Sequence, residues 1–348
     1  MAAPPGAERP WSLLRRGPVP PSPREKLAAH PLDATCRRRP GRRHRIEPQT
    51  PFVSPSATPR SARTGEPAAS AGSPHTATWA ATRLDAVVDL LGDPSPTVQV
   101  EVRRELERLG KRARPALKRA ARSADPRTRA RARLARLSDG RRRAVRRLLT
   151  YSTRPAIDLE SGAWLLSRLE RPDLDARPYL LALDAMAAEV IRRIEGRRPG
   201  PERALVLPQY LGQELGFTGD TEEYDHPDNV YLHRVIERRR GMPLTLAILY
   251  VCVARRAGLS AAPVPLPGHV FLRLRDGGKS RLVDVFEGGA RKSERDLLKY
   301  LADRHLPFNP TWFRDADDAT MLLRQVRNLR SSYRKRGLDR EARGLELA

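Results

Sequence analysis

A histidine and an aspartate in the second half of the chain are the residues whose types and spacing could do chemistry. His269 opens the alternating run "HVFLRL", Asp284 lies in the run "SRLVDV", and "DGG" stands between the two runs. Alternating strands on both sides of an Asp-Gly-Gly turn predict a β-hairpin. A carboxylate that holds an imidazole orients and polarises it. Such a pair is the general-base half of a Cys–His–Asp arrangement.

The length of the turn decides whether the two side chains meet. A two-residue loop of Asp276 and Gly277 places His269 directly opposite Asp284, with Cβ atoms about 5 Å apart. A loop of Gly277 and Gly278 shifts the register by one step on each strand and keeps both side chains on one face. A loop with an odd number of residues places them on opposite faces, and the pairing fails. The alternative role of His269 is a structural hydrogen bond at a strand end.

An apolar helix precedes the hairpin and must support it. Residues 244–254 are apolar at nearly every position apart from Thr245. A helix that is hydrophobic all round is a central, buried one. Pro243 is tolerated in its first turn, and Gly258 is expected at its C-terminal end. The sequence therefore predicts a buried helix followed by a small antiparallel sheet.

Several stretches resemble one family of proteins. The stretches "NVYLHRVIERRRGMPLTLAILYVCVARRAGL", "PGHVFLRL" and "VDVFEGG" are similar to the SirB-type transglutaminase-like family. "DLESGAWLLSRLERPDLD" and "ELGFTGDTEEYDHPDN" resemble the leading region of that family, and the resemblance runs from about Ile157 to about Asp339. It implies an α+β fold: a helical N-terminal part plus a papain/transglutaminase-like core, with the buried helix packed on a small antiparallel sheet.

The same resemblance raises the question of the nucleophile. In catalytic members of the wider superfamily a G-x-Cys motif opens the buried helix, where the helix N-terminus stabilises thiolate. The matching triplet is Gly241-Met242-Pro243, so proline occupies the cysteine position. Thr245 stands where SirB-type proteins usually have Ser or Thr, and a hydroxyl is a far poorer nucleophile than a thiolate. Cys252 lies further along the apolar helix, where a free cysteine is usually inert packing.

Two functions follow from these residues. The leading hypothesis is a non-catalytic binding or regulatory protein with a protein or peptide partner, in which His269 and Asp284 survive as a structural or ligand-orienting pair. The alternative is a hydrolase or acyltransferase with Thr245 as nucleophile, His269 as base and Asp284 as orienter. Proline at position 243 favours the hypothesis without enzyme activity. Neither hypothesis calls for a cofactor or a metal ion.

The basic charge supports a second alternative. Of the formal net charge of +25, residues 1–78 carry +8, residues 79–150 carry +12, and the remaining 198 residues carry only +5. Nucleic acid could therefore bind through residues 36–147, beginning with the arginine run "CRRRPGRRHR". The basic helices lack the interleaved aromatic residues on which bases stack. Solvent-exposed helical faces are therefore the favoured interpretation.

The composition divides the chain into four regions. Residues 1–78, rich in Pro, Ala, Ser and Arg, are expected to be disordered because they cannot bury enough apolar area. Residues 79–150 form a basic helical region that resembles HEAT-like repeats, in which Asp93-Pro94 recurs as Asp125-Pro126, each opening a helix. Residues 151–310 form the SirB-type transglutaminase-like domain. Residues 311–348 form a helical tail that resembles the start of a tetratricopeptide repeat.

The loop before the buried helix contains three potential metal ligands. Asp225, His226 and Asp228 lie within four residues, but no helix or strand fixes their geometry, so turn chemistry is the favoured interpretation. Asn229 is well placed as the N-cap of the following helix or as a turn residue.

Cysteine content and hydropathy bear on the compartment. Cys36 and Cys252 are the only two cysteines, which excludes a disulfide framework and favours a reducing compartment. No stretch approaches the ~20 consecutive apolar residues of a membrane span, and the N-terminus lacks the apolar region of a secretory signal. We expect a cytoplasmic protein without a membrane partner.

Overall fold

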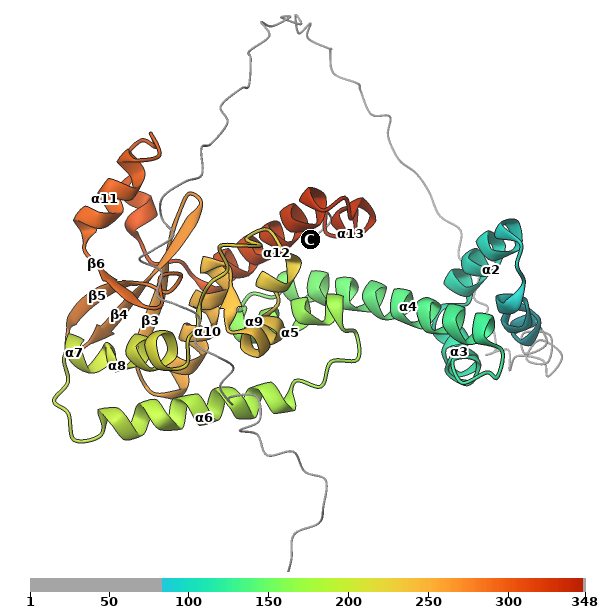
Figure 1. Cartoon of the computed structure of the whole chain (residues 1–348), viewed down its shortest axis with the longest axis horizontal. Helices are drawn as coiled ribbons and strands as arrows, with labels where there is room; N and C mark the ends of the chain where they lie inside the picture. Colours follow the sequence, from blue (N-terminus) through green and yellow to red (C-terminus); the bar gives the residue numbers. More distant parts are fainter. Residues whose placement is uncertain (1–82, 347–348) are drawn as a thin grey trace, which may run out of the picture. The chain divides into compact units, whose positions relative to one another are not determined.

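The computed structural model describes residues 83–346 of the chain (Figure 1). The predictions for residues 1–78, which include the disordered tail and the arginine run, lie outside the described residues. Among residues 83–346, none of the helices combines the length and the apolar character that a membrane crossing requires.

The first described residues form a helical region with a small core of its own. Residues 83–89 are helical. They are followed by η3 (Leu90–Gly92), α2 (Pro96–Leu109), η4 (Gly110–Ala113), α3 (Arg114–Ala120) and α4 (Pro126–Ser152). Leucine, valine and alanine side chains of these helices pack together, among them Val102, Leu106 and Leu117. We call residues 83–152 the front helices.

Of the two predicted helix starts in the front helices, one is found and the other lies two residues further along the chain. Asp125 caps α4, since its carboxylate accepts the backbone N–H groups of Arg127 and Thr128. Pro115 lies in the first turn of α3, where proline is tolerated. The helix expected at Asp93-Pro94 begins only at Pro96, because the Asp93 carboxylate accepts the N–H of Ser95 at 2.7 Å and turns the chain there.

Helix α4 joins the front helices to the rest of the protein. It is 27 residues long and continues past residue 150, where the sequence predicts a domain border. Ala132 packs in the core of the front helices, whereas Leu148 and Tyr151 belong to the large core. One continuous helix therefore contributes to both cores.

The large core is built around α10 (Pro243–Arg256). Every residue from Pro243 to Ala254 is buried, as the continuous apolar run predicts. Gly258 follows the helix with a φ of +69°, the conformation expected at a helix end. The surrounding elements are α5 (Leu159–Glu170), α6 (Arg177–Ile194), α7 (Pro201–Ala204), α8 (Val206–Pro208), the π-helix η5 (Gln209–Glu214), η6 (Pro227–Asn229) and α9 (Leu232–Arg238).

A four-stranded antiparallel sheet packs against α10. Its strands are β3 (Ser260–Leu266), β4 (His269–Asp276), β5 (Lys279–Asp284) and β6 (Ala290–Lys292), in that spatial order. The short strands β1 (Thr218–Gly219) and β2 (Arg240–Gly241) form a separate parallel pair just before α10. The α+β fold with a buried helix on a small antiparallel sheet is thereby confirmed.

The two faces of the four-stranded sheet meet different partners. Val270, Leu272 and Leu274 belong to the large core around α10. Phe271 and Leu282 point the other way and pack with α11 (Glu294–Ala302). Because side chains alternate along a strand, each residue of β4 and β5 can be assigned to one of these faces.

The C-terminal helices close the large core. They are η7 (Pro310–Phe313), α12 (Asp318–Lys335) and α13 (Asp339–Arg343). Met321, Leu322, Val326 and Leu329 of α12 all belong to the large core. The amino end of α12 is tied to α5, since the Asp318 carboxylate accepts the backbone N–H of Leu159 at 3.0 Å.

Candidate functional site

The hairpin that carries the histidine and the aspartate has the register expected for a loop of Gly277 and Gly278. Asp276 pairs with Lys279, and Leu272 pairs with Val283, so the loop consists of Gly277 and Gly278. Both glycines have positive φ, +58° and +77°. A two-residue hairpin loop of the favoured type needs positive φ at both positions, which Asp276 would adopt less readily than a glycine.

His269 and Asp284 meet on one face of the sheet, although they are not directly opposite. The imidazole Nε2 lies 2.9 and 3.0 Å from the two carboxylate oxygens of Asp284. The side chains are 13% and 4% exposed. In the neutral imidazole, a hydrogen on Nε2 points at the carboxylate and leaves the lone pair on Nδ1. Within residues 83–346, no group forms a hydrogen bond with this Nδ1.

The aspartate is held in place independently of the histidine. Its Oδ1 accepts the backbone N–H of Phe286 at 2.9 Å. The backbone carbonyl of Asp284 accepts the N–H of Gly289 at 2.8 Å, which closes the turn after β5. A carboxylate fixed by its own backbone is a rigid partner for the imidazole.

Aromatic rings surround the imidazole. The ring centroids of Phe271, Tyr300 and Phe286 lie 4.7, 5.5 and 5.8 Å from that of His269. Burial raises the pKa of the Tyr300 hydroxyl, which donates to the carbonyl of Pro267 at 2.9 Å. The histidine therefore lies in a largely apolar setting that keeps water from one side of the pair.

Helix α12 also reaches the start of β4. The Arg324 guanidinium donates to the backbone carbonyls of Leu266 and His269. Burial lowers the pKa of Arg324. This arginine thus holds both strands at the turn before the histidine and ties the position of His269 to the C-terminal helix.

Thr245 is not part of the pair. It is 1% exposed, and its hydroxyl donates to the carbonyl of Val230 at 3.4 Å. It lies in α10, which packs on the Val270 face of the sheet, whereas the ring of His269 lies beside Phe271 on the other face. The structure brings His269 and Asp284 together but does not bring Thr245 to them.

A phenylalanine stands between the amino end of α10 and the imidazole. Gly241, just before α10, pairs with Gly219 in the β1–β2 ladder. A Cβ on Gly219 would lie 2.3 Å from the ring of Phe286, so only glycine admits this ring. Phe286 then contacts His269 edge-on. The neighbour of the imidazole on this side is an apolar ring.

The cysteine of α10 is unsuited to replace a nucleophile. Cys252 is 2% exposed, and burial raises the pKa of its thiol well above the ordinary value. The thiol form is therefore favoured, and the thiolate is the reactive species. Cys36 lies outside the described residues.

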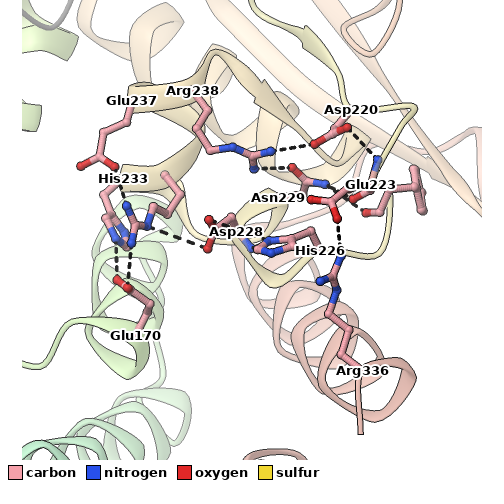
Figure 2. Close-up of polar contacts among 12 residues, drawn as sticks. Glu170, Asp220, Glu223, His226, Asp228, Asn229, His233, Glu237, Arg238 and Arg336 are labelled. Carbon is pink, nitrogen blue, oxygen red and sulfur yellow. Dashed lines mark hydrogen bonds and ion pairs between the residues drawn. The ribbon is translucent and has the colours of Figure 1, made fainter. Parts of the chain in front are cut away.

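A polar network holds the loop that precedes α10 (Figure 2). The Arg238 guanidinium bridges the carboxylate of Asp220 at 2.8 Å and the amide oxygen of Asn229 at 2.9 Å. The Asn229 amide nitrogen donates to the carbonyls of Glu223 and Tyr224 at 2.7 and 3.2 Å. Of the two roles expected for Asn229, the cap is not found, because these contacts occupy its side chain and α9 begins three residues later. Asn229 instead ends the short turn η6.

This network positions one more aromatic residue near the pair. The ring of Tyr224 contacts the ring of Phe286 edge-on at 5.9 Å. Arg336 of α12 forms an ion pair with Glu223 at 3.1 Å (Figure 2). The loop with Tyr224 is thus fixed from α9 and from the C-terminal helix.

Of the three potential metal ligands of the same loop, Asp225 pairs with a residue of α12, whereas His226 and Asp228 contact each other. The carboxylate of Asp225 pairs with Lys335 at 2.8 Å. His226 Nδ1 accepts the backbone N–H of Asp228 at 3.1 Å, as in a turn. Across residues 83–346, no group of three His, Cys, Asp or Glu residues is arranged to hold a metal ion.

A second histidine lies in a buried ionic cluster. His233 is fully buried, and its Nε2 lies 3.0 Å from the carboxylate of Glu170, which also pairs with Arg234 at 2.9 Å (Figure 2). Burial lowers the pKa of His233, although the neighbouring Glu170 raises it. Its Nδ1 is buried without a hydrogen-bond partner.

The residues around the pair that the sequence did not single out are Tyr224, Phe286, Tyr300 and Arg324. For Phe286 the sequence contains a signal, because this residue follows Asp284 by two positions, in the turn that comes directly after β5. The other three come from a loop and two helices that lie far away in the sequence. Their approach depends on tertiary packing.

About half of the chain is similar to known proteins. Residues 177–327 match the transglutaminase-like superfamily. A UPF0162 protein of Xylella fastidiosa strain Temecula1 is 34% identical over 189 residues, which are 51% of this chain and 65% of the relative. A UPF0162 protein of Pseudomonas aeruginosa is 26% identical over 53% of this chain and 67% of the relative.

The likeness extends to a eukaryotic protein. Human F-box only protein 21 is 28% identical over 174 residues, which are 48% of this chain and 27% of that protein. This chain spans less than two thirds of the length of the Xylella relatives. No solved structure gave a significant match. Residues 177–327 thus form a transglutaminase-like domain, which includes α10, the sheet and the His269–Asp284 pair.

Proposed function

We propose that the transglutaminase-like domain is a binding or regulatory module that has lost thiol chemistry. The observation that carries the proposal is the amino end of α10, where Pro243 is the first residue of the helix and is buried. The resemblance to transglutaminase-like proteins puts this proline where catalytic members of the superfamily have cysteine. Thiol chemistry needs a thiolate at this helix end within reach of the imidazole. The described residues offer an apolar ring, Phe286, as the neighbour of the imidazole instead.

The alternative is a hydrolase or acyltransferase that uses Thr245. A general base must come within hydrogen-bonding distance of the proton that it removes. The hydroxyl of Thr245 donates to the Val230 carbonyl, and His269 lies on the other face of the sheet. This geometry disfavours the alternative, in which Thr245, His269 and Asp284 act together.

In the proposed module, His269 and Asp284 orient a ligand or brace the sheet. Asp284 fixes the ring, and the lone pair on Nδ1 can accept a hydrogen bond from a peptide N–H. The surrounding rings of Tyr224, Phe286 and Tyr300 offer apolar contact area to the same ligand. A peptide or protein segment combines both properties, so we propose a protein or peptide partner.

The flanking regions support a role in binding. The front helices precede the domain, and we propose that they are HEAT-like, because such repeats present a helical face to partners. Similarly, α12 and α13 would be the start of a tetratricopeptide-like tail. With two cysteines in the whole chain, a reducing, cytoplasmic compartment remains our proposal.

Nucleic-acid binding through residues 36–147 has less support. Residues 36–82 lie outside the described residues. In α4, Arg129, Arg131 and Arg133 donate to backbone carbonyls of neighbouring turns. These guanidinium groups are engaged in holding the helices together. If nucleic acid does bind, retention on immobilised nucleic acid should fall steeply with salt.

Two measurements on the full chain test the proposal. The first is turnover of a p-nitrophenyl ester and of a glutamine peptide with an amine acceptor, by the wild type and by the variants Thr245→Ala and His269→Ala. We expect background rates from all three. Turnover that both substitutions abolish would establish the enzyme and refute the module.

The second measurement selects ligands. Peptides that bind the immobilised chain are selected from a random library, and their affinities are then measured for His269→Ala and for His305→Asn, an exposed histidine away from the pair. We expect about tenfold weaker binding for His269→Ala only, which corresponds to about 1.4 kcal/mol. Equal affinities for both variants would exclude the pair as a binding site.

A further inference from the structure

A groove between α2 and α4 is separate from the site described above. It encloses about 650 Å³, and its lining includes the buried side chains of Leu91, Val102, Leu106 and Leu117. These side chains belong to the core of the front helices. The groove lies outside residues 177–327, which match the transglutaminase-like superfamily.

The rim of the groove exposes apolar side chains. Val100 of α2 is 45% exposed and Leu134 of α4 is 63% exposed, and both line the groove. An isolated exposed leucine is ordinary on a protein surface. Here two exposed apolar residues border a floor that is itself apolar, which is typical of an interaction site. Covering this surface would gain about 25 cal/mol for each Å² of apolar area.

The charges along the groove are unbalanced. Its two acidic residues already have basic partners: Glu107 pairs with Arg142 at 2.8 Å, and Asp139 pairs with Arg114 at 2.9 Å. Two further arginines of the lining, Arg103 of α2 and Arg340 of α13, are exposed. Neither has an ion pair with any of residues 83–346. The groove therefore presents positive charge that its own acids do not neutralise.

We propose that this groove binds an acidic amphipathic helix of a partner protein. Apolar side chains at i, i+3, i+4 and i+7 of that helix would lie on the leucine and valine floor, as in other helix-in-groove complexes. Its carboxylates would pair with Arg103 and Arg340. The proposal does not depend on the role of the His269–Asp284 pair.

The lining favours an acidic helix over nucleic acid. A phosphate backbone has no apolar face to cover Val100 and Leu134. The lining contains no aromatic side chain on which a base could stack. An amphipathic helix with glutamates on its polar face satisfies the apolar floor and the free arginines together.

The test is fluorescence anisotropy with a labelled model peptide and the full-length protein. The peptide is about 18 residues long, roughly five helical turns, with leucine at the i, i+3, i+4 and i+7 positions and glutamate at most others. A peptide of the same composition with scrambled leucine positions is the control. We expect the patterned peptide to bind at least about tenfold more tightly than the scrambled one.

Variants locate the binding. Val100→Asp and Leu134→Glu should each weaken binding of the patterned peptide about tenfold, because each places a negative charge where the proposed helix makes apolar contact. Leu137→Glu, which places the same charge on an exposed leucine of α4 outside the groove, should stay within about twofold. Should a charged variant lose its helical circular dichroism, Val100→Ala and Leu134→Ala replace it, each with an expected loss of about threefold.

A second pair of variants measures the contribution of charge to peptide binding. Arg103→Glu should weaken binding and reduce its salt dependence, whereas Arg147→Glu, on an exposed arginine of α4 outside the groove, should change it little. Equal binding of the scrambled peptide would overturn the proposal. A second pair of results would also overturn it: duplex DNA displaces the peptide, and Leu134→Glu binds the peptide as tightly as the wild type. Binding would then be electrostatic attraction alone.

Discussion

The front helices and the transglutaminase-like domain differ in how completely the apolar side chains of their central helices are buried. In the domain, α10 is buried along its length from Pro243 to Ala254, and the sheet is covered on both faces. In the front helices, the core consists of few residues, many of them alanine, and Val100 and Leu134 remain exposed.

The difference teaches where each region can act. Around α10 and the sheet the domain has covered its apolar side chains, and its candidate site contains one imidazole whose Nδ1 has no hydrogen bond with residues 83–346. The front helices have surface left to cover. We therefore expect substitutions in the interior of the domain to lower its stability. In the front helices, we expect substitutions on the surface to weaken binding.

The largest expected effect is a difference in unfolding free energy between two leucine-to-alanine substitutions, one in each region. Leu246→Ala, in the fully buried part of α10, should lower the free energy of unfolding by about 3 kcal/mol, because it leaves a cavity in a packed core. Leu134→Ala in α4 should change it by less than about 0.5 kcal/mol, because that side chain is mostly exposed. Urea unfolding followed by tryptophan fluorescence measures both. Similar losses would show that the front helices are packed as tightly as the domain.

The next effect concerns the imidazole–carboxylate pair. His269→Ala should lower the free energy of unfolding by about 2 kcal/mol, because Asp284 is 4% exposed and its carboxylate loses the hydrogen bond from the imidazole. The backbone N–H of Phe286 still compensates part of the charge. The matched control is His305→Asn, since His305 is exposed and has a φ of +53°, which asparagine tolerates. A loss below that of the control would mean that the pair does not brace the sheet.

A smaller effect distinguishes the buried histidine of the ionic cluster. Burial lowers the pKa of His233 below its ordinary value of 6.5. The unfolded chain therefore binds a proton more readily, and the stability present above pH 6.5 is lost as the pH falls below it. The slope reaches at most about 1.4 kcal/mol for each pH unit.

Unfolding free energies between pH 7.5 and 5.5, measured for the wild type and for His233→Gln, test this. The difference between the two curves should narrow towards low pH. His305→Asn should leave the pH dependence as it is. Parallel curves for the wild type and His233→Gln would show that His233 titrates alike in the folded and unfolded chains.

The smallest effect is expected at the threonine. Thr245→Val should change the unfolding free energy by less than about 1 kcal/mol, because the hydroxyl makes one long hydrogen bond and the two side chains have the same shape. The Val230 carbonyl keeps a second donor, the amide of Gln325 at 2.9 Å. Urea unfolding of this variant gives the value. A loss above about 2 kcal/mol would indicate a polar contact of Thr245 beyond the Val230 carbonyl.

The sequence predicts well where a local pattern determines structure. The run from Leu244 to Ala254 has no polar face, so it can only be buried, and Gly258 ends its helix. The hairpin follows from alternation and from the Asp-Gly-Gly turn. Its register was left open because two loops of equal length are available, although the need for positive φ at both positions favours Gly277 and Gly278.

The rest depends on tertiary contacts that no local pattern contains. Asparagine is a residue type that often caps helices, but the side chain of Asn229 forms hydrogen bonds with Arg238 and with two backbone carbonyls instead. Tyr300 and Arg324 reach the histidine from two helices, and Tyr224 contacts Phe286 from a loop. The separation of Thr245 from His269 depends on which face of the sheet α10 covers, and spacing along the chain does not determine that.

The most direct test of the central claim is covalent labelling of the full chain. The protein is incubated with a fluorophosphonate and with an activated ester, and adducts are located by intact-mass and peptide mass spectrometry. We predict no adduct on Thr245, because its side chain is buried and its hydroxyl donates to the carbonyl of Val230. A single adduct on Thr245 that disappears in His269→Ala would contradict this account and establish a working nucleophile.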